Sequence, residues 1–141
     1  MVGNSSIIDG LKARIGDEWQ AGVYPVERET VQRFIRAVGD PNPRWQNDEY
    51  VPPTFVVSLG FDRIEQELAK DRSATLLHGS TELECYQPVR VGDTLTVSAK
   101  ILDIRERPGK MGKTAFVTFK LNYMNQRQEL IATCRQMLIS Y

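Results

Sequence analysis

The clearest structural signal in the chain lies at Thr94–Arg105, which reads TLTVSAKILDIR. Apolar residues alternate with polar ones over its first half, at Leu95, Val97, Ala99 and Ile101. This period of two is typical of a β-strand with one buried face. The apolar positions then shift by one residue, to Leu102 and Ile104. A shift inside an unbroken run predicts a β-bulge, which bends a long strand.

Other runs in the second half of the chain have the same period. The clearest of them places Val117, Phe119, Leu121 and Tyr123 on one face. Turn residues separate the runs, and the sequence predicts four strands at about 80–88, 94–105, 113–124 and 129–140. Three of these are about 10–12 residues long, roughly twice the usual length of a strand. We therefore expect long antiparallel strands in a curved sheet.

A strongly apolar segment precedes these strands. It begins with Thr54-Phe55-Val56-Val57 after two prolines and continues to about Lys70. Its first two turns are apolar on nearly all sides, which favours a helix surrounded by protein, and about 17 helical residues would span roughly 25 Å. The β-branched residues would also suit a strand, but the length and the later Arg, Glu, Gln, Leu and Ala residues favour a helix. The economical packing is an α+β fold in which a long curved antiparallel sheet wraps around a central apolar helix.

The first third of the chain is predicted to be mostly helical. Ser5–Ile15 forms a short helix with one apolar face, made of Ile7, Ile8, Leu11 and Ile15. A short extended stretch at Gly22–Val26 leads to a second helix, whose apolar stripe is Val31, Phe34, Ile35 and Val38. Gly39 ends this helix, and the prolines at 41 and 43 prevent its continuation.

Length and composition limit the class of protein. The 141 residues suit one domain, residues 1–141, with a substantial core. Because 18 Lys and Arg balance 18 Asp and Glu, the charge points neither to nucleic acid nor to a membrane surface as a partner. No segment approaches the roughly 18 consecutive apolar residues of a membrane span, and the N-terminus lacks the apolar core of a signal peptide. We therefore expect a soluble, cytoplasmic protein.

The supply of reactive side chains is small. One histidine, His78, and two cysteines, Cys85 and Cys134, are too few for a zinc site made of four cysteines or of two cysteines and two histidines, and we expect neither a metal nor a resident cofactor. GxSxG, Walker and GxGxxG patterns are absent, so three large enzyme classes lose their usual signatures. Both cysteines stand in alternating apolar runs. We interpret them as small buried hydrophobic residues, with a disulfide or a reactive thiol as the alternative.

The stretch Ala37–Trp45, AVGDPNPRW, is the one that suggests chemistry. A helix-ending glycine followed by an Asp-Pro-Asn turn would account for it without any function. Together with three later segments, however, it resembles the MaoC-like dehydratase superfamily, and within it the N-terminal, fatty-acid-synthase-type dehydratase branch. The four matching segments are Ile15–Trp45, Pro52–Phe55, Leu77–Gly79 and Tyr86–Leu95. Their order suits the family from about residue 13 to the C-terminus, and the resemblance implies the hot-dog fold, the same sheet-around-helix arrangement that the periodicity predicts.

The resemblance also implies a chemistry. Catalytic members of the superfamily hydrate trans-2-enoyl thioesters, or dehydrate (R)-3-hydroxyacyl thioesters, carried on CoA or acyl carrier protein. Their motif is Gly-Asp-x-Asn-Pro-x-His, in which Asp and His act as a general acid/base pair while backbone N–H groups near the central helix polarise the thioester carbonyl. Such a reaction needs groups that change charge near neutral pH and fixed donors for the incipient enolate. Asp40 and Asn42 are the candidate catalytic residues that this motif assigns.

One position departs from the motif. The matching residues are Gly39, Asp40, Asn42 and Pro43, but Trp45 stands at the His position. An indole N–H donates a hydrogen bond and cannot accept a proton in this pH range. Because half of the acid/base pair is missing, we do not expect an intact dyad mechanism in this chain. Members of the N-terminal branch often carry an aromatic residue here and partner a His-bearing hot dog, and the His-lacking half then helps to shape the acyl channel.

His78 is the other candidate acid/base residue. It stands in Leu77-His78-Gly79, a tripeptide common in this branch, for which the resemblance implies a structural or dimer-interface position. A place near the thioester channel is the alternative.

Two groups of residues are candidates for substrate binding. The first group lines a predicted acyl site and comprises Trp45, Tyr50, Thr54, Phe55 and Phe61, although ordinary core packing would also explain the aromatic residues at 50, 55 and 61. Thr54 is further expected to cap the apolar helix, whose first N–H groups are candidate thioester donors. The second group surrounds the Pro108-Gly109 turn and comprises Arg105, Lys110 and Lys113. These cations suit CoA phosphates, with a solvated hairpin tip as the alternative.

Four functional hypotheses remain open at this point. In the first hypothesis, the chain is the accessory half of a heteromeric (R)-specific enoyl-thioester hydratase or 3-hydroxyacyl-thioester dehydratase. In the second, it is a self-sufficient homodimeric enzyme that uses Asp40 together with His78 or a water. The third hypothesis is a non-enzymatic module that binds acyl thioesters, and the fourth is a hot-dog thioesterase with a lone carboxylate. An open curved sheet leaves an edge to be covered, so we expect a homodimer or a heterodimer with a His-bearing MaoC-like subunit.

Overall fold

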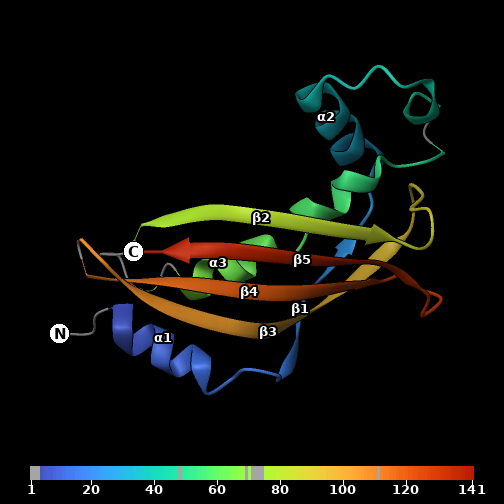
Figure 1. Cartoon of the computed structure of the whole chain (residues 1–141). Helices are drawn as coiled ribbons and strands as arrows, with labels where there is room; N and C mark the ends of the chain where they lie inside the picture. Colours follow the sequence, from blue (N-terminus) through green and yellow to red (C-terminus); the bar gives the residue numbers. More distant parts are fainter. Residues whose placement is uncertain (1–3, 48, 69, 71–74, 111) are drawn as a thin grey trace.

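The computed structural model describes residues 4–47, 49–68, 70, 75–110 and 112–141 (Figure 1). Its elements are α1 (Asn4–Lys12), β1 (Glu18–Pro25), α2 (Arg28–Val38), η1 (Pro43–Trp45), η2 (Pro53–Ser58), α3 (Phe61–Leu68), β2 (Leu76–Cys85), β3 (Thr94–Gly109), β4 (Gly112–Met124) and β5 (Leu130–Ser140). The two η elements are short 3-10 helices. The predicted α+β class is confirmed.

The strands form a five-stranded antiparallel sheet in the order β1-β3-β4-β5-β2. All four strands predicted in the second half are present, but their bounds differ. β2 covers Leu76–Cys85 instead of about 80–88, and β3 and β4 extend further than predicted, to the hairpin at Gly109 and Gly112. The predicted bulge is also present. The register of β3 against β4 shifts between Ile101 and Asp103, so Leu102 is the inserted residue.

The fifth strand, β1, is longer than the short extended stretch that the sequence predicts at 22–26. It covers Glu18–Pro25 and pairs with β3 along one edge of the sheet, with a bulge between Gln20 and Gly22. Within β1 only Ala21 is buried. Because an edge strand buries so little, its sequence lacks the apolar alternation that marks the other strands.

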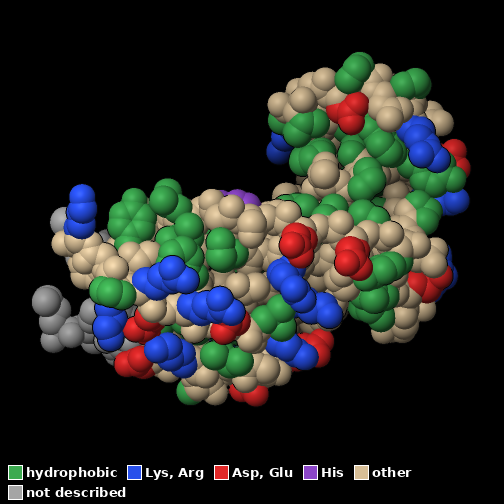
Figure 2. Space-filling model, in the orientation of Figure 1, with side chains coloured by type: hydrophobic (Ala, Val, Ile, Leu, Met, Phe, Trp, Pro, Cys, Tyr) green, Lys and Arg blue, Asp and Glu red, His purple; other side chains and the backbone are tan. Residues whose placement is uncertain are grey.

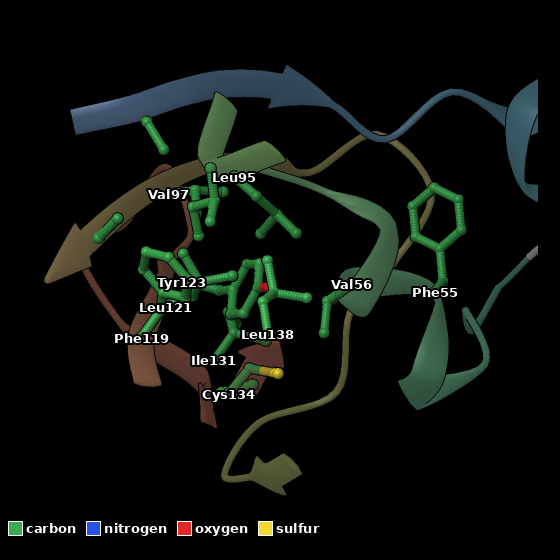
Figure 3. Packing of buried hydrophobic residues seen from close by; sticks show 14 of the residues in the cluster. Phe55, Val56, Leu95, Val97, Phe119, Leu121, Tyr123, Ile131, Cys134 and Leu138 are labelled. Atoms are coloured by element: carbon green, nitrogen blue, oxygen red, sulfur yellow. The ribbon is translucent and has the colours of Figure 1, made fainter. Parts of the chain in front are cut away.

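The core lies between the sheet and the helices on its inner face. Figure 1 shows α3 against the sheet behind β4 and β5, and its residues Ile64 and Leu68 are fully buried. The three central strands β3, β4 and β5 contribute their inward-facing positions, among them Leu95, Val97, Phe119, Leu121, Tyr123 and Leu138 (Figure 3). Burying each large apolar side chain stabilises the fold by about 1.5–3 kcal/mol. This packing accounts for the strict alternation in β3 and β4.

The central apolar segment is not one helix, and the prediction of a single rod from Thr54 to about Lys70 is wrong. It divides into η2 and α3, with Leu59 and Gly60 between them. Gly60 has a φ of +84°, and a Cβ at this position would lie 2.8 Å from Cγ1 of Val97. The backbone thus turns where it touches β3, in a conformation that only glycine adopts easily.

The N-terminal helix α1 packs on β3. Ile8 and Leu11 are buried as predicted, whereas Ile15 lies beyond the end of the helix and is 42% exposed, so its predicted place on the apolar face is wrong. The Nζ of Lys12 lies 2.7 Å from Oε1 of Glu106 on β3. This ion pair joins the end of α1 to the sheet.

The second helix, α2, stands with η1 as an arm beyond one end of the sheet (Figure 1). Val31 and Ile35 are buried, and Gly39 ends the helix as predicted, with a φ of +68° and its N–H donated to the carbonyl of Ile35. Val38 is 56% exposed despite its place in the apolar stripe. The apolar face of α2 is therefore only partly covered.

The two cysteines differ. Cys134 is buried on β5, as predicted, but Cys85 is exposed, which contradicts the interpretation of both as buried residues. The physical reason is that Cys85 ends β2, an edge strand with a neighbour on one side only. Burial raises the pKa of the Cys134 thiol, so this sulfur stays neutral.

Candidate functional site

The turn after α2 is built around the carboxylate of Asp40. Its Oδ1 accepts a hydrogen bond from the backbone N–H of Asn42, at 3.0 Å. The Oδ1 of Asn42 in turn accepts from the N–H of Arg44, at 3.0 Å, and so caps η1. Asn42 is exposed and serves here as a turn-forming and capping residue.

Trp45 closes this turn onto Asp40. The indole Nε1 donates to Oδ2 of Asp40 at 2.9 Å, and the half-buried ring packs against the hydrophobic core. Both carboxylate oxygens therefore accept hydrogen bonds from groups that only donate. The position that the family motif gives to an imidazole is filled, at hydrogen-bonding distance from Asp40, by a group that cannot take up a proton.

A hollow of about 380 Å³ lies beside Trp45. Its lining includes Trp45, Tyr50 and Val56, together with the segment that runs from Cys85, the last residue of β2, to Val89. Tyr50 is held by an isolated bridge to Arg90, whose guanidinium carbon lies 5.1 Å from the centre of the Tyr50 ring. Of the predicted substrate-binding residues, Trp45 and Tyr50 are thus brought together here.

A larger groove, of about 690 Å³, lies between α2, η2 and α3 on one side and the inner face of β2 and β5 on the other. We call it the helix–edge groove. Its lining residues are Phe34, Val38, Thr54, Val57, Ser58, Phe61, Asp62, Glu65, His78, Thr81 and Gln136. Figure 2 shows hydrophobic side chains on both sides of the notch where the arm meets the sheet. The groove is bordered mostly by apolar surface.

His78 lies at the exposed rim of the helix–edge groove. Its Nε2 and the Oγ1 of Thr81 are 2.7 Å apart, and its ring centre is 6.4 Å from that of Phe61. Asp40 borders neither this groove nor the hollow beside Trp45. The structure thus holds the two candidate acid/base residues in separate hydrogen-bonded pairs, Asp40 with Trp45 and His78 with Thr81.

Two predicted residues at the start of the apolar segment have different surroundings. Thr54 borders the helix–edge groove, but η2 begins after Pro52 without a side-chain cap, so the prediction that Thr54 caps a helix is wrong. Phe55 is 3% exposed and packs edge-to-face on Phe34, with ring centres 5.5 Å apart. Figure 3 shows its ring apart from the main core cluster, beyond Val56. Phe55 fixes the arm to η2 rather than lining either cavity.

The predicted phosphate-binding cations lie on the β3–β4 hairpin, at the end of the sheet away from the arm (Figure 1). Arg105 pairs with Asp103 at 2.9 Å, and Lys113 lies 3.4 Å from Glu106. Hydrogen bonds from Lys12 and then Lys113 lower the pKa of Glu106. Lys110 is exposed near the tip. The structure does not bring these cations to either cavity.

Residues of the helix–edge groove that sequence reasoning missed include Thr81 and Gln136. They face each other across the β2–β5 pairing. Gln136 follows Ala132 and Cys134 at the same inward-facing positions of β5, and all three are buried. A polar residue at an inward-facing position of an alternating strand indicates a candidate site residue, and this pattern at Gln136 is visible in the sequence.

Within the described ranges, no three His, Cys, Asp or Glu side chains lie close enough together to bind a metal ion. Over the same residues, no helix has the length and the apolar character needed to cross a membrane.

Comparison with known proteins places this geometry in a family. The family model for the FAS1-like dehydratase domain region matches residues 13–134. A UPF0336 protein of Streptomyces avermitilis is 36% identical over 101 residues, which are 61% of this chain and 67% of that protein.

Solved structures show the same fold at lower identity. The C-terminally truncated HadBC (3R-hydroxyacyl-ACP dehydratase) complex of Mycobacterium tuberculosis matches with a TM-score of 0.72 at 22% identity, over 89% of this chain and 96% of that chain. The (R)-hydratase of A. caviae involved in PHA biosynthesis matches with a TM-score of 0.70 at 18% identity, over 88% and 94%. The predicted hot-dog fold is confirmed. Because the family model spans most of the sequence, the chain belongs to the family of the FAS1-like dehydratase domain region.

Proposed function

We propose that this chain is the accessory half of a heteromeric (R)-specific enoyl-thioester hydratase or 3-hydroxyacyl-thioester dehydratase. In this proposal a His-bearing MaoC-like subunit supplies the acid/base pair. The present chain shapes the site for an acyl group carried on CoA or acyl carrier protein. The single observation that carries the proposal is the hydrogen bond from Trp45 Nε1 to Asp40 Oδ2, at 2.9 Å.

The surroundings of Asp40 support this role. A general acid/base pair needs a second group that accepts a proton near neutral pH. The partners of Asp40 are an indole N–H and the backbone N–H of Asn42, and neither accepts a proton in that range. His78 is paired with Thr81 at the rim of the helix–edge groove and not with Asp40. In this proposal both members of the acid/base pair therefore come from the partner subunit.

The edge strand β2 supports the association that the proposal requires. It pairs with β5 on one side, and its residues are mostly exposed. An exposed edge of this length presents free backbone donors and acceptors that a second hot-dog subunit can pair. The mycobacterial protein to which the chain is similar is itself a complex.

Co-expression with His-bearing MaoC-like subunits of the same cell tests the proposal. We expect a stable complex that hydrates crotonyl-CoA, while this chain alone does not exceed the background rate. Asp40→Asn in this chain should leave the rate of the complex within about twofold, whereas replacing the partner's catalytic His should abolish it. Hydration by the isolated chain at the rate of the complex, with loss in Asp40→Asn and His78→Ala, would establish a self-sufficient enzyme instead.

A second candidate function is acyl-thioester binding without turnover. The helix–edge groove favours it, because a groove of about 690 Å³ bordered mostly by apolar surface suits an acyl chain. Binding alone requires no acid/base pair. Calorimetry with acyl-CoA separates the two functions: binding without hydration, alone and with every His-bearing partner, would support the second.

A further inference from the structure

One wall of the helix–edge groove is acidic. Asp62 and Glu65 are three residues apart on α3, so they lie on the same side of this helix, and both border the groove. Arg63 and Glu67 border a different hollow, beside Trp19 on β1. None of the described residues that line the helix–edge groove is a Lys or an Arg. The α3 side of the groove is therefore negatively charged.

These two carboxylates have no cationic partner within the described part of the chain. Glu65 forms no hydrogen bond or ion pair there. Oδ1 of Asp62 accepts a hydrogen bond from the Tyr24 hydroxyl at 3.3 Å. Burial and then the charge of Asp62 raise the pKa of Tyr24, so this donor stays neutral and leaves the carboxylate charge unbalanced. His78, on the opposite wall, is paired with Thr81. The groove thus favours a ligand that carries a positive charge.

The floor of the groove adds a buried acceptor. Gln136 borders the groove from β5 and is only 1% exposed. Its Nε2 lies 3.5 Å from the sulfur of Cys134, a weak partner, and its carbonyl Oε1 has no partner among the described residues. Buried polar side chains nearly always have a hydrogen-bond partner, and one left without it destabilises the fold. The Gln136 carbonyl therefore needs a donor from a ligand.

An alkylammonium ion suits all of these features. It carries three N–H donors and one positive charge, and it accepts no hydrogen bond. The donors suit the Gln136 carbonyl, and the charge suits the two carboxylates. The hydrocarbon chain suits the apolar part of the lining, which includes Phe34, Val38, Val57 and Phe61. The acidic wall would repel a carboxylate ligand, and an uncharged alcohol would gain no charge attraction from it.

We propose that the helix–edge groove binds an aliphatic chain that carries a protonated amine. The ammonium group lies between the acidic wall of α3 and the Gln136 amide, and the chain lies on the apolar part of the lining. The amine is either free or part of an acyl group on CoA or acyl carrier protein. In the first form the inference is independent of the proposed function. In the second form it rests on the proposed function and names its substrate class.

Calorimetry with the full chain, and with its complex where one forms, tests the proposal. The free probes are octylamine, octanol and octanoate, which share one chain length. We expect octylamine to bind about three- to thirtyfold more tightly than octanol, and octanoate to bind most weakly. About 0.5 M NaCl should reduce the preference for octylamine.

Two thioesters, octanoyl-CoA and 8-aminooctanoyl-CoA, distinguish the two sources of the amine. A preference for the amino derivative indicates an amine on the acyl group. Tight binding of octylamine without that preference indicates a free amine. Either result supports the proposal.

Substitutions locate the charge and the acceptor. Glu65→Gln should lower the affinity for octylamine about threefold or more and leave the affinity for octanol unchanged. Glu67→Gln, on the same helix but facing the other hollow, is the matched control and should change neither affinity by more than about twofold. Gln136→Met, which preserves the length of the side chain, should weaken octylamine binding and raise the melting temperature without ligand. If this buried variant does not fold, the exposed Glu65→Gln still decides the question.

Four outcomes would overturn the proposal. The free probes bind equally and neither thioester is preferred, or octanol or octanoate binds most tightly, as expected if the amide presents its N–H groups to the groove. The preference for the amine is the same in Glu65→Gln as in the wild type, or no probe binds because a second copy of the chain fills the groove.

Failure of the proposed function is a separate result, measured by hydration of crotonyl-CoA. An active complex without a preference for the amine would overturn this inference alone. A preference for octylamine in a chain that no His-bearing partner activates would overturn the proposed function alone.

Discussion

The indole Nε1 of Trp45 donates a 2.9 Å hydrogen bond to Oδ2 of Asp40, five residues earlier in the chain. This bond joins the two ends of the turn that follows α2, and the Trp45 ring packs against the core at the same time. The position that carries the general base in catalytic relatives therefore has a structural task here. It holds the turn closed on the arm.

Trp45→Phe should accordingly lower the free energy of unfolding. It removes a hydrogen bond to a half-buried carboxylate while retaining an aromatic ring, and we expect a loss of about 1–2 kcal/mol in urea unfolding. Trp19→Phe is the matched control, because Trp19 contacts the Arg14 guanidinium at 4.7 Å rather than a carboxylate. Equal losses in the two variants would contradict a specific contribution from the bond to Asp40.

Gly60→Ala should be more damaging than Gly39→Ala. Both glycines have a positive φ, +84° and +68°, which costs an alanine about 1–2 kcal/mol. A Cβ on Gly39 meets no atom within 4 Å, whereas a Cβ on Gly60 lies 2.8 Å from Cγ1 of Val97. Chemical unfolding should show that Gly60→Ala destabilises by at least about 1 kcal/mol more. A similar loss in both variants would mean that the contact with β3 is relieved by small backbone shifts.

The attachment of α1 should depend on pH through Glu106. Hydrogen bonds from Lys12 and then Lys113 lower the pKa of Glu106 below its ordinary value of 4.5, and Glu106 raises the pKa of Lys12 above 10.5. A lowered carboxyl pKa stabilises the folded state above 4.5, and this contribution is lost as the pH falls through the folded-state pKa. For the raised lysine pKa, the contribution is present below 10.5 and is lost as the pH rises through the folded-state value.

The difference in urea midpoint between wild type and Glu106→Gln measures this contribution. It should be largest between these two limits and shrink toward zero in acid and in strong base. Hydrogen exchange of the α1 amides should follow the same profile, because α1 packs on β3 next to this ion pair. A difference that does not change with pH would indicate a packing effect of Glu106 instead of a charge effect.

Lys120→Glu should stabilise the chain. Lys100, Lys120 and Arg135 stand directly opposite one another in one row on β3, β4 and β5. The two outer cations also face acids, Glu18 on β1 and Glu82 on β2, whereas Lys120 has a cation on each side. Like charges directly opposite destabilise a sheet, and an acid in the middle replaces two repulsions by two attractions, for about 0.5–1 kcal/mol. The gain should be measured in urea at low salt and shrink in about 0.5 M NaCl. Lys110→Glu, on the hairpin outside this row, is the control and should change little.

The long strands, the bulge at Leu102 and the C-terminal end of α2 are all visible in the sequence. They depend on local rules: alternation for a strand with one buried face, a shift of register for a bulge, and a glycine with positive φ for the end of a helix. The family resemblance and the departure from the motif at Trp45 are also visible in the sequence, because both depend only on which residue stands at each position. Edge strands escape these rules. Neither the full length of β1 nor the exposure of Cys85 follows from local pattern, because each depends on having a neighbour on one side only.

The other features of the fold and the site depend on contacts between segments that are far apart in the sequence. The break at Gly60 arises where the apolar segment touches Val97, far along the chain on β3, and local propensity contains no trace of that contact. The separation of Asp40 from His78, and the position of Gln136 at the floor of a groove, follow from how the arm, η2 and the β2–β5 edge pack together. The burial of a side chain and its hydrogen-bond partners both depend on this packing. A buried amide with a single weak partner therefore becomes recognisable only when all its neighbours are in place.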